Sequence, residues 1–204
     1  MPDFELEDQA GGIIAGVDEA GRGPWAGPVV AGAVILDRAA LPEILIRGLD
    51  DSKKLSAKRR AELFHALKGH AKIGVGIAEV AEIDALNILQ ATMLAMTRAV
   101  GDLGVRPSLV LVDGNREPAL DCPVRTVIGG DGKSMSIAAA SIVAKVTRDR
   151  VMAELALEHP GYGWERNSGY GTKEHSEALQ RLGVSRHHRK SFKPIIKILR
   201  SDSR

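Results

Sequence analysis

Four acidic residues stand at places in the sequence where carboxylates could bind a divalent cation. Asp18 and Glu19 are adjacent at the point where an apolar segment, beginning at Ile13, runs into a glycine-rich loop. Two ionised carboxylates side by side repel each other unless a cation or a basic group lies between them. Hard divalent cations, which take oxygen ligands, suit such a pair best. An Asp-Glu pair can also decorate a turn, but the strand-like segment before it and the loop after it favour a site.

Asp113 and Asp131 extend this set of acids. Asp113 follows a buried-looking strand over residues 108–112, and ligands of α/β folds gather at the C-terminal ends of strands. Asp131 comes shortly before a long helix expected over residues 135–159. Alone, Asp131 could simply be an acid favoured by the dipole at a helix N-terminus. With the other three carboxylates, it becomes a fourth candidate metal ligand.

The elements that must position these acids follow from the residue patterns, which predict an α/β fold. Small and β-branched residues or alternating apolar residues predict strands over 13–17, 28–36, 71–80 and 123–128, in addition to 108–112. Helical spacing predicts a helix after the N-cap Ser56, one helix over 81–103, the helix over 135–159, and a short helix between Thr172 and Gly183. Successive strand residues point to opposite faces, so Asp18 and Glu19 can share one site only if their strand ends or twists there.

The loop after Glu19 predicts a rigid, exposed backbone surface. Gly21, Gly23 and Gly27 allow positive φ or a close approach to a ligand, while two prolines stiffen the same segment. The loop also fits the dinucleotide pattern G-x-G-x-x-A, but that motif needs a helix directly after it, and here a strand follows. A kinase-like glycine hairpin is excluded too, because no V-A-I-K, H-R-D or D-F-G pattern occurs.

Length and composition indicate one globular domain with a small appendage. The chain has 204 residues, 44% of them hydrophobic, and no repeats. Cys122 is the single cysteine, which excludes a disulfide framework and a cysteine-rich zinc site. The acidic first residues do not resemble a targeting peptide, and no apolar run could span a membrane, so we expect a cytoplasmic protein. Residues 1–12 are expected to be a flexible acidic lead-in.

Charge is segregated along the chain. Residues 181–204 contain eight Lys or Arg and one Asp, a formal charge of +7, which leaves −5 on the preceding residues because the total is +2. A basic tail beside an acidic body suits an enzyme that holds a polyanion with one part and metal ions with the other. A solvated basic terminus would look the same, so the tail alone decides nothing.

The arrangement D-E-A-G-R-G-P-x-A-G-P-V-V at positions 18–30 resembles the start of ribonuclease HII, the family that cuts at ribonucleotides in duplexes. Further motifs follow in the family's order: DSKKL at 51–55, VDG at 112–114, GGD-x-K-S at 129–134, GYxTxxH at 169–175 and HRxSF at 188–192. The resemblance covers roughly residues 13–194. The related ribonuclease HIII usually has an added N-terminal domain and a different glycine loop, so it is less similar.

The resemblance implies a ribonuclease H-like fold, with a mixed five-stranded sheet flanked by helices and a small helical C-terminal part. Residues 13–160 would form the catalytic core, and residues 161–204 a helical segment with the basic tail, together one compact unit. Two divalent cations, Mg²⁺ or Mn²⁺, would be held by the catalytic carboxylates Asp18, Glu19, Asp113 and Asp131. The implied activity is hydrolysis on the 5′ side of a ribonucleotide, in RNA/DNA hybrids or in duplex DNA with embedded ribonucleotides, leaving 5′-phosphate and 3′-hydroxyl ends.

The resemblance also implies substrate contacts. The backbone of Gly21, Arg22 and Gly23 would recognise the ribose 2′-hydroxyl, the group that distinguishes RNA from DNA at a fixed site. Lys53 or Lys54 would contact phosphates, although an exposed lysine pair is more often solvated surface. Tyr170 would pack against a nucleotide, the alternative being a buried structural tyrosine.

Two other functions stay open at this level. A non-catalytic nucleic-acid-binding module would need only the basic tail and the loop lysines, but uncompensated acids weaken binding to phosphate. Another two-metal nuclease or phosphotransferase of the same fold is the second. We expect a monomer, and the sequence shows no recognisable clamp-binding peptide.

Overall fold

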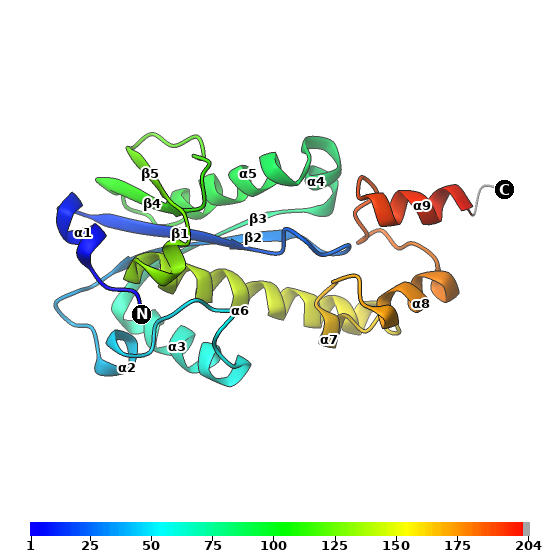
Figure 1. Cartoon of the computed structure of the whole chain (residues 1–204), viewed down its shortest axis with the longest axis horizontal. Coiled ribbons are helices and arrows are strands. Elements are labelled where there is room, and N and C mark those ends of the chain that lie inside the picture. Colours follow the sequence, from blue (N-terminus) through cyan, green and yellow to red (C-terminus); the bar gives the residue numbers. More distant parts are fainter. Residues whose placement is uncertain (202–204) are drawn as a thin grey trace.

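The computed structural model describes residues 1–201, and a mixed five-stranded sheet is the centre of the fold (Figure 1). The strands are β1 (Ile14–Ala20), β2 (Val29–Leu36), β3 (Ala71–Ala78), β4 (Leu109–Asp113) and β5 (Val124–Val127), in the spatial order β3-β2-β1-β4-β5. The pairs β1–β2 and β2–β3 are antiparallel, while β4 is parallel to both β1 and β5. The predicted fold class is therefore confirmed. The last residues of the predicted basic tail, 202–204, lie outside the described residues.

Helices cover both faces of the sheet, and a small group of helices follows at the C-terminal end (Figure 1). They are α1 (Glu5–Ala10), α2 (Glu43–Ile46), α3 (Ala57–His70), α4 (Val80–Leu86), α5 (Ile88–Gly101), the 3₁₀ helix η1 (Gly130–Gly132), α6 (Met135–Glu158), α7 (Trp164–Asn167), α8 (Lys173–Leu182) and α9 (Lys193–Ser201). The N-caps Ser56, Ser134 and Thr172 each accept a hydrogen bond from a backbone N–H three residues later, and the sequence had left Ser134 and Ser136 open as caps of the long helix. None of the described helices combines the length and apolar composition needed to cross a bilayer.

Glycines in the sheet allow the two long helices to lie very close to it. On the face covered by α6, a Cβ added to Gly16 would lie 2.1 Å from the carbonyl carbon of Ser136. On the face covered by α5, a Cβ added to Gly76 would lie 2.0 Å from the carbonyl oxygen of Ala95. Since real side chains do not tolerate such distances, the spacing between sheet and helices depends on the missing side chains.

The N-terminal residues differ from the flexible lead-in that was expected. Residues 5–10 form α1, and Glu7 is only 3% exposed. Its carboxylate accepts hydrogen bonds of 2.6 Å from the hydroxyls of both Ser134 and Ser136 at the start of α6. A carboxylate is stabilised there by hydroxyl donors and by the helix dipole, which the acidic composition alone does not indicate.

The single helix predicted over residues 81–103 is wrong, because the chain forms two helices there. Asn87 separates α4 from α5 and has a φ of 72°. Asparagine adopts positive φ more readily than most residues, and its side chain is a good cap. Here its Oδ1 accepts hydrogen bonds from the N–H groups of Leu89 and Gln90.

The small helical C-terminal part is present, and it is tied to the rest of the protein by backbone contacts. Ala26, in the glycine-rich loop, forms an isolated bridge with His188. Asp84, in α4, accepts hydrogen bonds from the backbone N–H groups of Lys190 and Ser191. The basic segment, for which a solvated terminus was one of two interpretations, is thus partly docked, with Arg189 fully buried.

Candidate active site

Three of the four predicted carboxylates meet at one edge of the sheet. Asp18 lies near the end of β1, and Asp113 is the last residue of the neighbouring parallel strand β4. Asp131 lies in η1, just before α6. Carboxylate oxygens of these three residues lie within 4.8 Å of one another, and two of the residues are buried. The fold thus brings together three carboxylates that come from β1, β4 and η1.

Glu19 stands slightly apart from this cluster. Strand β1 continues to Ala20, so Glu19 follows Asp18 within the strand, and its carboxylate lies 3.4 Å from the guanidinium of Arg22. It still lines the same hollow as Asp18 and Asp113. Burial raises the pKa of Glu19 against the pull of Arg22, and the charge of Asp113 raises it further.

The cluster is electrostatically unfavourable without a cation. Burial, followed by the charges of Glu19 and Asp113, raises the pKa of Asp18 well above its ordinary value. Burial, Asp51 and Asp113 likewise raise the pKa of Asp131. Such shifts arise when carboxylates are brought together in a poorly solvated place. Because the donors are all carboxylate oxygens, the set fits a hard divalent cation of the Mg²⁺ or Mn²⁺ type.

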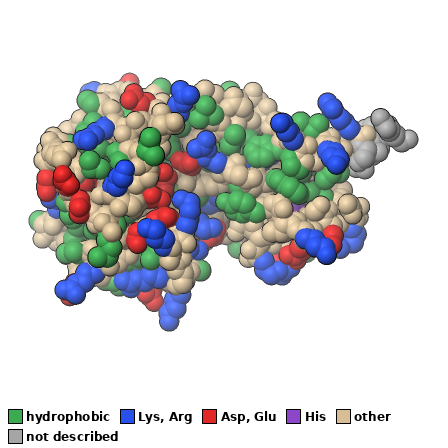
Figure 2. Space-filling model, in the orientation of Figure 1, with side chains coloured by type: hydrophobic (Ala, Val, Ile, Leu, Met, Phe, Trp, Pro, Cys, Tyr) green, Lys and Arg blue, Asp and Glu red, His purple; other side chains and the backbone are tan. Residues whose placement is uncertain are grey.

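A hollow of about 380 Å³ opens beside the carboxylates. Its walls are Asp18, Glu19 and Asp113 on one side, the loop 20–23 on another, and basic residues with Tyr170 on the rest. Figure 2 shows acidic and basic side chains together near the middle of this face. A hollow that combines carboxylates with cationic groups can hold a metal-bound phosphodiester.

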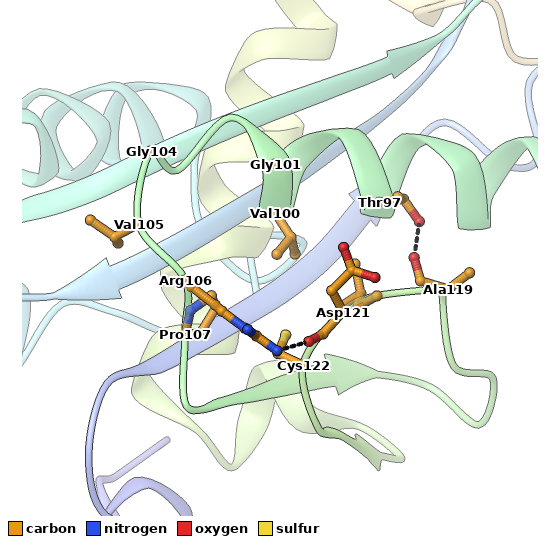
Figure 3. Close-up of a pocket in the computed structure, with 11 residues that line it drawn as sticks. Thr97, Val100, Gly101, Gly104, Val105, Arg106, Pro107, Ala119, Asp121 and Cys122 are labelled. Atoms are coloured by element: carbon orange, nitrogen blue, oxygen red, sulfur yellow. Dashed lines mark hydrogen bonds between the residues drawn. The ribbon is translucent and has the colours of Figure 1, made fainter.

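A larger hollow, of about 470 Å³, lies elsewhere and lacks this chemistry (Figure 3). It is lined by the end of α5 and by loops carrying Arg106, Asp121 and Cys122, and Thr97 donates a hydrogen bond to the Ala119 carbonyl oxygen across it. It gathers no group of carboxylates. Size alone therefore does not identify the site.

Of the two lysines expected near the substrate, the structure brings only Lys53 to the site. Its ammonium lies 3.5 Å from Asp131 and 3.7 Å from Asp51, and it lines the hollow. Although burial opposes the shift, the charges of Asp18, Asp51 and Asp131 raise the pKa of Lys53. Lys54 instead pairs with Asp50 at 3.1 Å, and it is not among the residues that line the hollow.

The glycine-rich loop needs positive φ at only some of its glycines. Gly21 has a φ of 97° and Gly27 a φ of 81°, whereas Gly23 does not use this region. A Cβ on Gly23 would lie 3.5 Å from a ring carbon of Tyr170, which is an ordinary contact. Of the two roles expected for these glycines, positive φ applies to Gly21 and Gly27, while a close approach to a ligand stays a prediction for Gly23. Tyr170 is 48% exposed, so it is not the buried structural tyrosine considered above.

Two buried arginines support the loop on its inner side, a role that neither the HRxSF motif containing Arg189 nor the helical pattern around Arg148 indicated. Arg189 donates hydrogen bonds to the carbonyl oxygens of Gly21, Arg22, Gly27 and Pro28 at 2.6 to 3.1 Å. Arg148, in α6, donates to the carbonyl oxygens of Ala26, Pro28 and Ser168. Burial lowers the pKa of Arg148 to about 10, and burial together with Arg148 lowers the pKa of Arg189 to about 9. Both remain charged at neutral pH.

Two further basic residues of the hollow were also missed. Arg60 and Lys145 line it, and both pair with Asp149, at 3.7 Å and 2.7 Å. Arg60 also donates to the carbonyl oxygens of Ser52 and Leu55, which fixes the loop that carries Lys53. Helical spacing places Lys145 and Asp149 on one side of α6, but only tertiary structure turns that side toward the carboxylates.

Comparison with known proteins agrees with this geometry. The family model for ribonuclease HII matches residues 15–195. Ribonuclease HII of Paramagnetospirillum magneticum is 62% identical over 96% of this chain and 97% of its own, and that of Ruegeria pomeroyi is 60% identical over 98% and 86%. Among solved structures, ribonuclease H2 from Pyrococcus horikoshii superposes with a TM-score of 0.77 at 28% identity, covering 94% of this chain and 99% of that one.

These matches extend over nearly the whole chain and show the same family at every level of comparison. They give no support to a non-catalytic binding module. Ribonucleases H depend on metal ions, and the carboxylate cluster provides a candidate place for them. The chain therefore belongs to the ribonuclease HII family and is an endoribonuclease that acts on RNA/DNA hybrids.

Proposed function

We propose that Asp18, Glu19, Asp113 and Asp131 hold two divalent cations, Mg²⁺ or Mn²⁺, and that the enzyme cuts on the 5′ side of a ribonucleotide, including one embedded in duplex DNA. The observation that carries this proposal is the meeting of Asp18, Asp113 and Asp131 with oxygens within 4.8 Å of one another. Two cations between shared carboxylates would supply an activated water and stabilise the leaving oxygen. The products would be 5′-phosphate and 3′-hydroxyl ends.

The chain's own residues have distinct parts in this proposal. Lys53, Arg60 and Lys145 line the hollow and would attract the phosphates of the cut strand. Lys53 already lies among Asp51, Asp131 and the charge of Asp18, so its ammonium can neutralise the same carboxylates until a phosphate draws it outward. Lys54 has no place in the hollow and is left out of the proposal.

Recognition of the ribose is proposed for the backbone of residues 21–23. The carbonyl oxygens of Gly21 and Arg22 are fixed by Arg189, so the loop is held in place before any substrate arrives. Gly23 is open enough for close approach, and the exposed ring of Tyr170 lies beside it. A rigid backbone next to an aromatic platform suits recognition of a sugar and stacking of its base.

The proposed working form is a cytoplasmic monomer. The curated relatives compared above are bacterial, and in bacteria duplexes with ribonucleotides occur in the cytoplasm. All the groups assigned to the hollow come from one chain, so no second copy is needed to complete it.

The test is cleavage of a DNA duplex containing one ribonucleotide. We expect a single nick on its 5′ side with Mg²⁺ or Mn²⁺ and none with a chelator. Asp113→Asn should lower the rate about a thousandfold or more, because one metal-binding oxygen is lost. Asp121→Asn is the matched control, since Asp121 is an exposed acid that does not line the hollow beside the carboxylates. Cleavage by Asp113→Asn at the parent rate, or in chelator, would contradict the proposal.

A further inference from the structure

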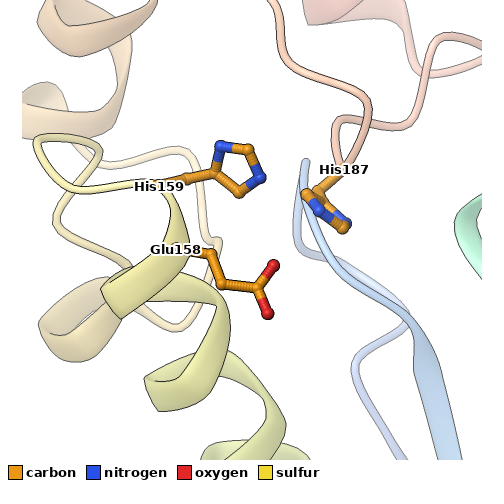
Figure 4. Close-up of side chains that lie close together, drawn as sticks. All are labelled: Glu158, His159 and His187. Atoms are coloured by element: carbon orange, nitrogen blue, oxygen red, sulfur yellow. The ribbon is translucent and has the colours of Figure 1, made fainter.

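A second group of metal-binding side chains lies at the far end of α6. Glu158 is the last residue of α6, His159 follows it, and His187 comes from the loop before α9. One ligand atom from each lies within 4.8 Å of the others. Figure 4 shows the Glu158 carboxylate and a ring nitrogen of His159 directed toward His187. Two imidazoles and a carboxylate form a recurrent set for transition metals.

An unpaired nitrogen in this group points to a missing partner. The Nε2 atom of His159 is buried and has no hydrogen-bond partner among the described residues. Buried polar atoms in proteins are nearly always paired, so an unpaired one calls for a ligand or a water.

Arg186 marks the place where a cation is favourable. Its guanidinium lies 3.6 Å from the Glu158 carboxylate, and its Nε donates to Nε2 of His187 at 3.0 Å. The Arg186 side chain is 73% exposed, so it can swing into solvent and give up both contacts. A metal ion could therefore replace the Arg186 guanidinium beside Glu158 and His187.

We propose that Glu158, His159 and His187 form a binding site for a transition-metal ion of the Zn²⁺ type, separate from the catalytic cations. The separation follows from α6, whose 24 residues span about 36 Å: Asp131 lies just before its first residue, and Glu158 is its last. The chemistry differs as well: imidazole ligands select Zn²⁺, Ni²⁺ or Co²⁺, whereas the catalytic cluster offers only carboxylates. Three protein ligands leave a fourth position for water.

Such an ion would fasten the C-terminal part to the catalytic core. The carbonyl oxygen of His187 accepts a hydrogen bond from the N–H of Gly27 at 2.9 Å. Two residues later, Arg189 holds the carbonyl oxygens of Gly21 and Arg22. Binding at His187 would thus stabilise the segment that supports the glycine-rich loop, and the folded state would gain stability by mass action.

The experiment is a titration with Zn²⁺ in excess Mg²⁺, which fills the oxygen site, followed by calorimetry. We expect one equivalent of Zn²⁺ to bind and to raise the Tm. His159→Gln and His187→Gln should each weaken binding by at least roughly tenfold, since even a residue outside the ligand shell can cost that much. His65→Gln, at an exposed histidine away from the group, is the matched control and should bind like the parent.

Two further variants keep the result interpretable. Glu158→Gln changes a side chain that is 58% exposed, so it should fold normally and still weaken Zn²⁺ binding. Arg186→Gln removes the competing cation and should bind Zn²⁺ equally or more tightly. Co²⁺ should give visible absorption bands of nitrogen ligation that are lost in His187→Gln. The proposal is overturned if no Zn²⁺ binds in excess Mg²⁺, or if these ligand variants bind it like the parent.

Discussion

Two sets of buried charges lie beside the same glycine-rich loop, and they are treated in opposite ways. The carboxylates Asp18 and Asp131 are crowded by like charges, and their pKa values are raised. The guanidinium groups of Arg148 and Arg189 are equally buried, but each of their nitrogens donates to a backbone carbonyl oxygen. Burying a charge is costly unless fixed partners compensate it. The comparison teaches that the charges with fixed backbone partners support the fold, while the crowded carboxylates, whose pKa values stay raised despite Lys53, are poised to bind a cation.

The largest change in the free energy of unfolding should come from removing a buried arginine that has fixed backbone partners. Arg189→Met would leave several loop carbonyl oxygens without donors, so we expect it to lower the free energy of unfolding by about 3 kcal/mol or more. Urea denaturation measures this loss. Lys190→Met, at the exposed neighbouring position, is the matched control and should change stability by less than about 0.5 kcal/mol. Equal stabilities of the two variants would mean that the buried guanidinium is not a support.

The next largest loss of stability should come from substitutions in the glycine-rich loop, where Gly21 and Gly23 should differ. Gly21 has a φ of 97°, and a Cβ there would lie 2.0 Å from Nε of Arg148. Gly21→Ala should therefore cost about 2 kcal/mol in unfolding free energy through backbone strain and displacement of that arginine. Gly23→Ala has neither problem and should fold like the parent while losing preference for a ribonucleotide-containing duplex. Binding is measured in Ca²⁺ against duplexes that differ by one 2′-hydroxyl; an unchanged preference would make Tyr170 the next candidate.

Removing one of the crowded carboxylates should raise the free energy of unfolding, whereas removing a buried arginine lowers it. In chelator at pH 7, Asp18→Asn should be more stable than the parent by about 1 kcal/mol while losing activity. The folded parent holds the Asp18 proton more tightly than the unfolded chain, so its stability falls as pH rises from about 4 through the raised pKa. The advantage of the variant should thus disappear below about pH 4 and shrink when Mg²⁺ is added. Urea denaturation across pH tests this, and a less stable variant at pH 7 would contradict it.

The smallest effect, a change in the salt dependence of binding without a change in stability, should come from neutralising exposed lysines. Lys190 and Lys193 are exposed near the docked C-terminal segment, unlike Arg189. Changing both to Gln should leave stability unchanged and reduce the slope of log affinity against log salt by up to about 1.8, for all duplexes alike. An unchanged slope would assign these lysines to solvated surface.

The sequence predicted those features that depend on local order along the chain. Asp113 was recognisable because it follows a buried strand, and Ser56 and Thr172 because caps precede helical patterns. Arg148 and Arg189 were not, because arginine is usually a surface residue and only the tertiary structure surrounds these two with carbonyl oxygens. The position of Glu19 relative to the carboxylate cluster was left conditional on where its strand ends, and β1 continues to Ala20. The metal-binding role of the four acids stays a prediction.

The contact between Gly16 and the backbone of Ser136 bears on how such an enzyme can evolve. Gly16 lies two residues before Asp18, and Ser136 lies five residues after Asp131, so their contact sets how far apart the two carboxylates are held. A methyl group on Gly16 would come within 2.1 Å of a carbonyl carbon, so strand or helix would have to move. Exposed residues can change without loss of cleavage activity. Gly16 cannot gain a side chain, so selection for cleavage should keep it as strictly as it keeps the acids.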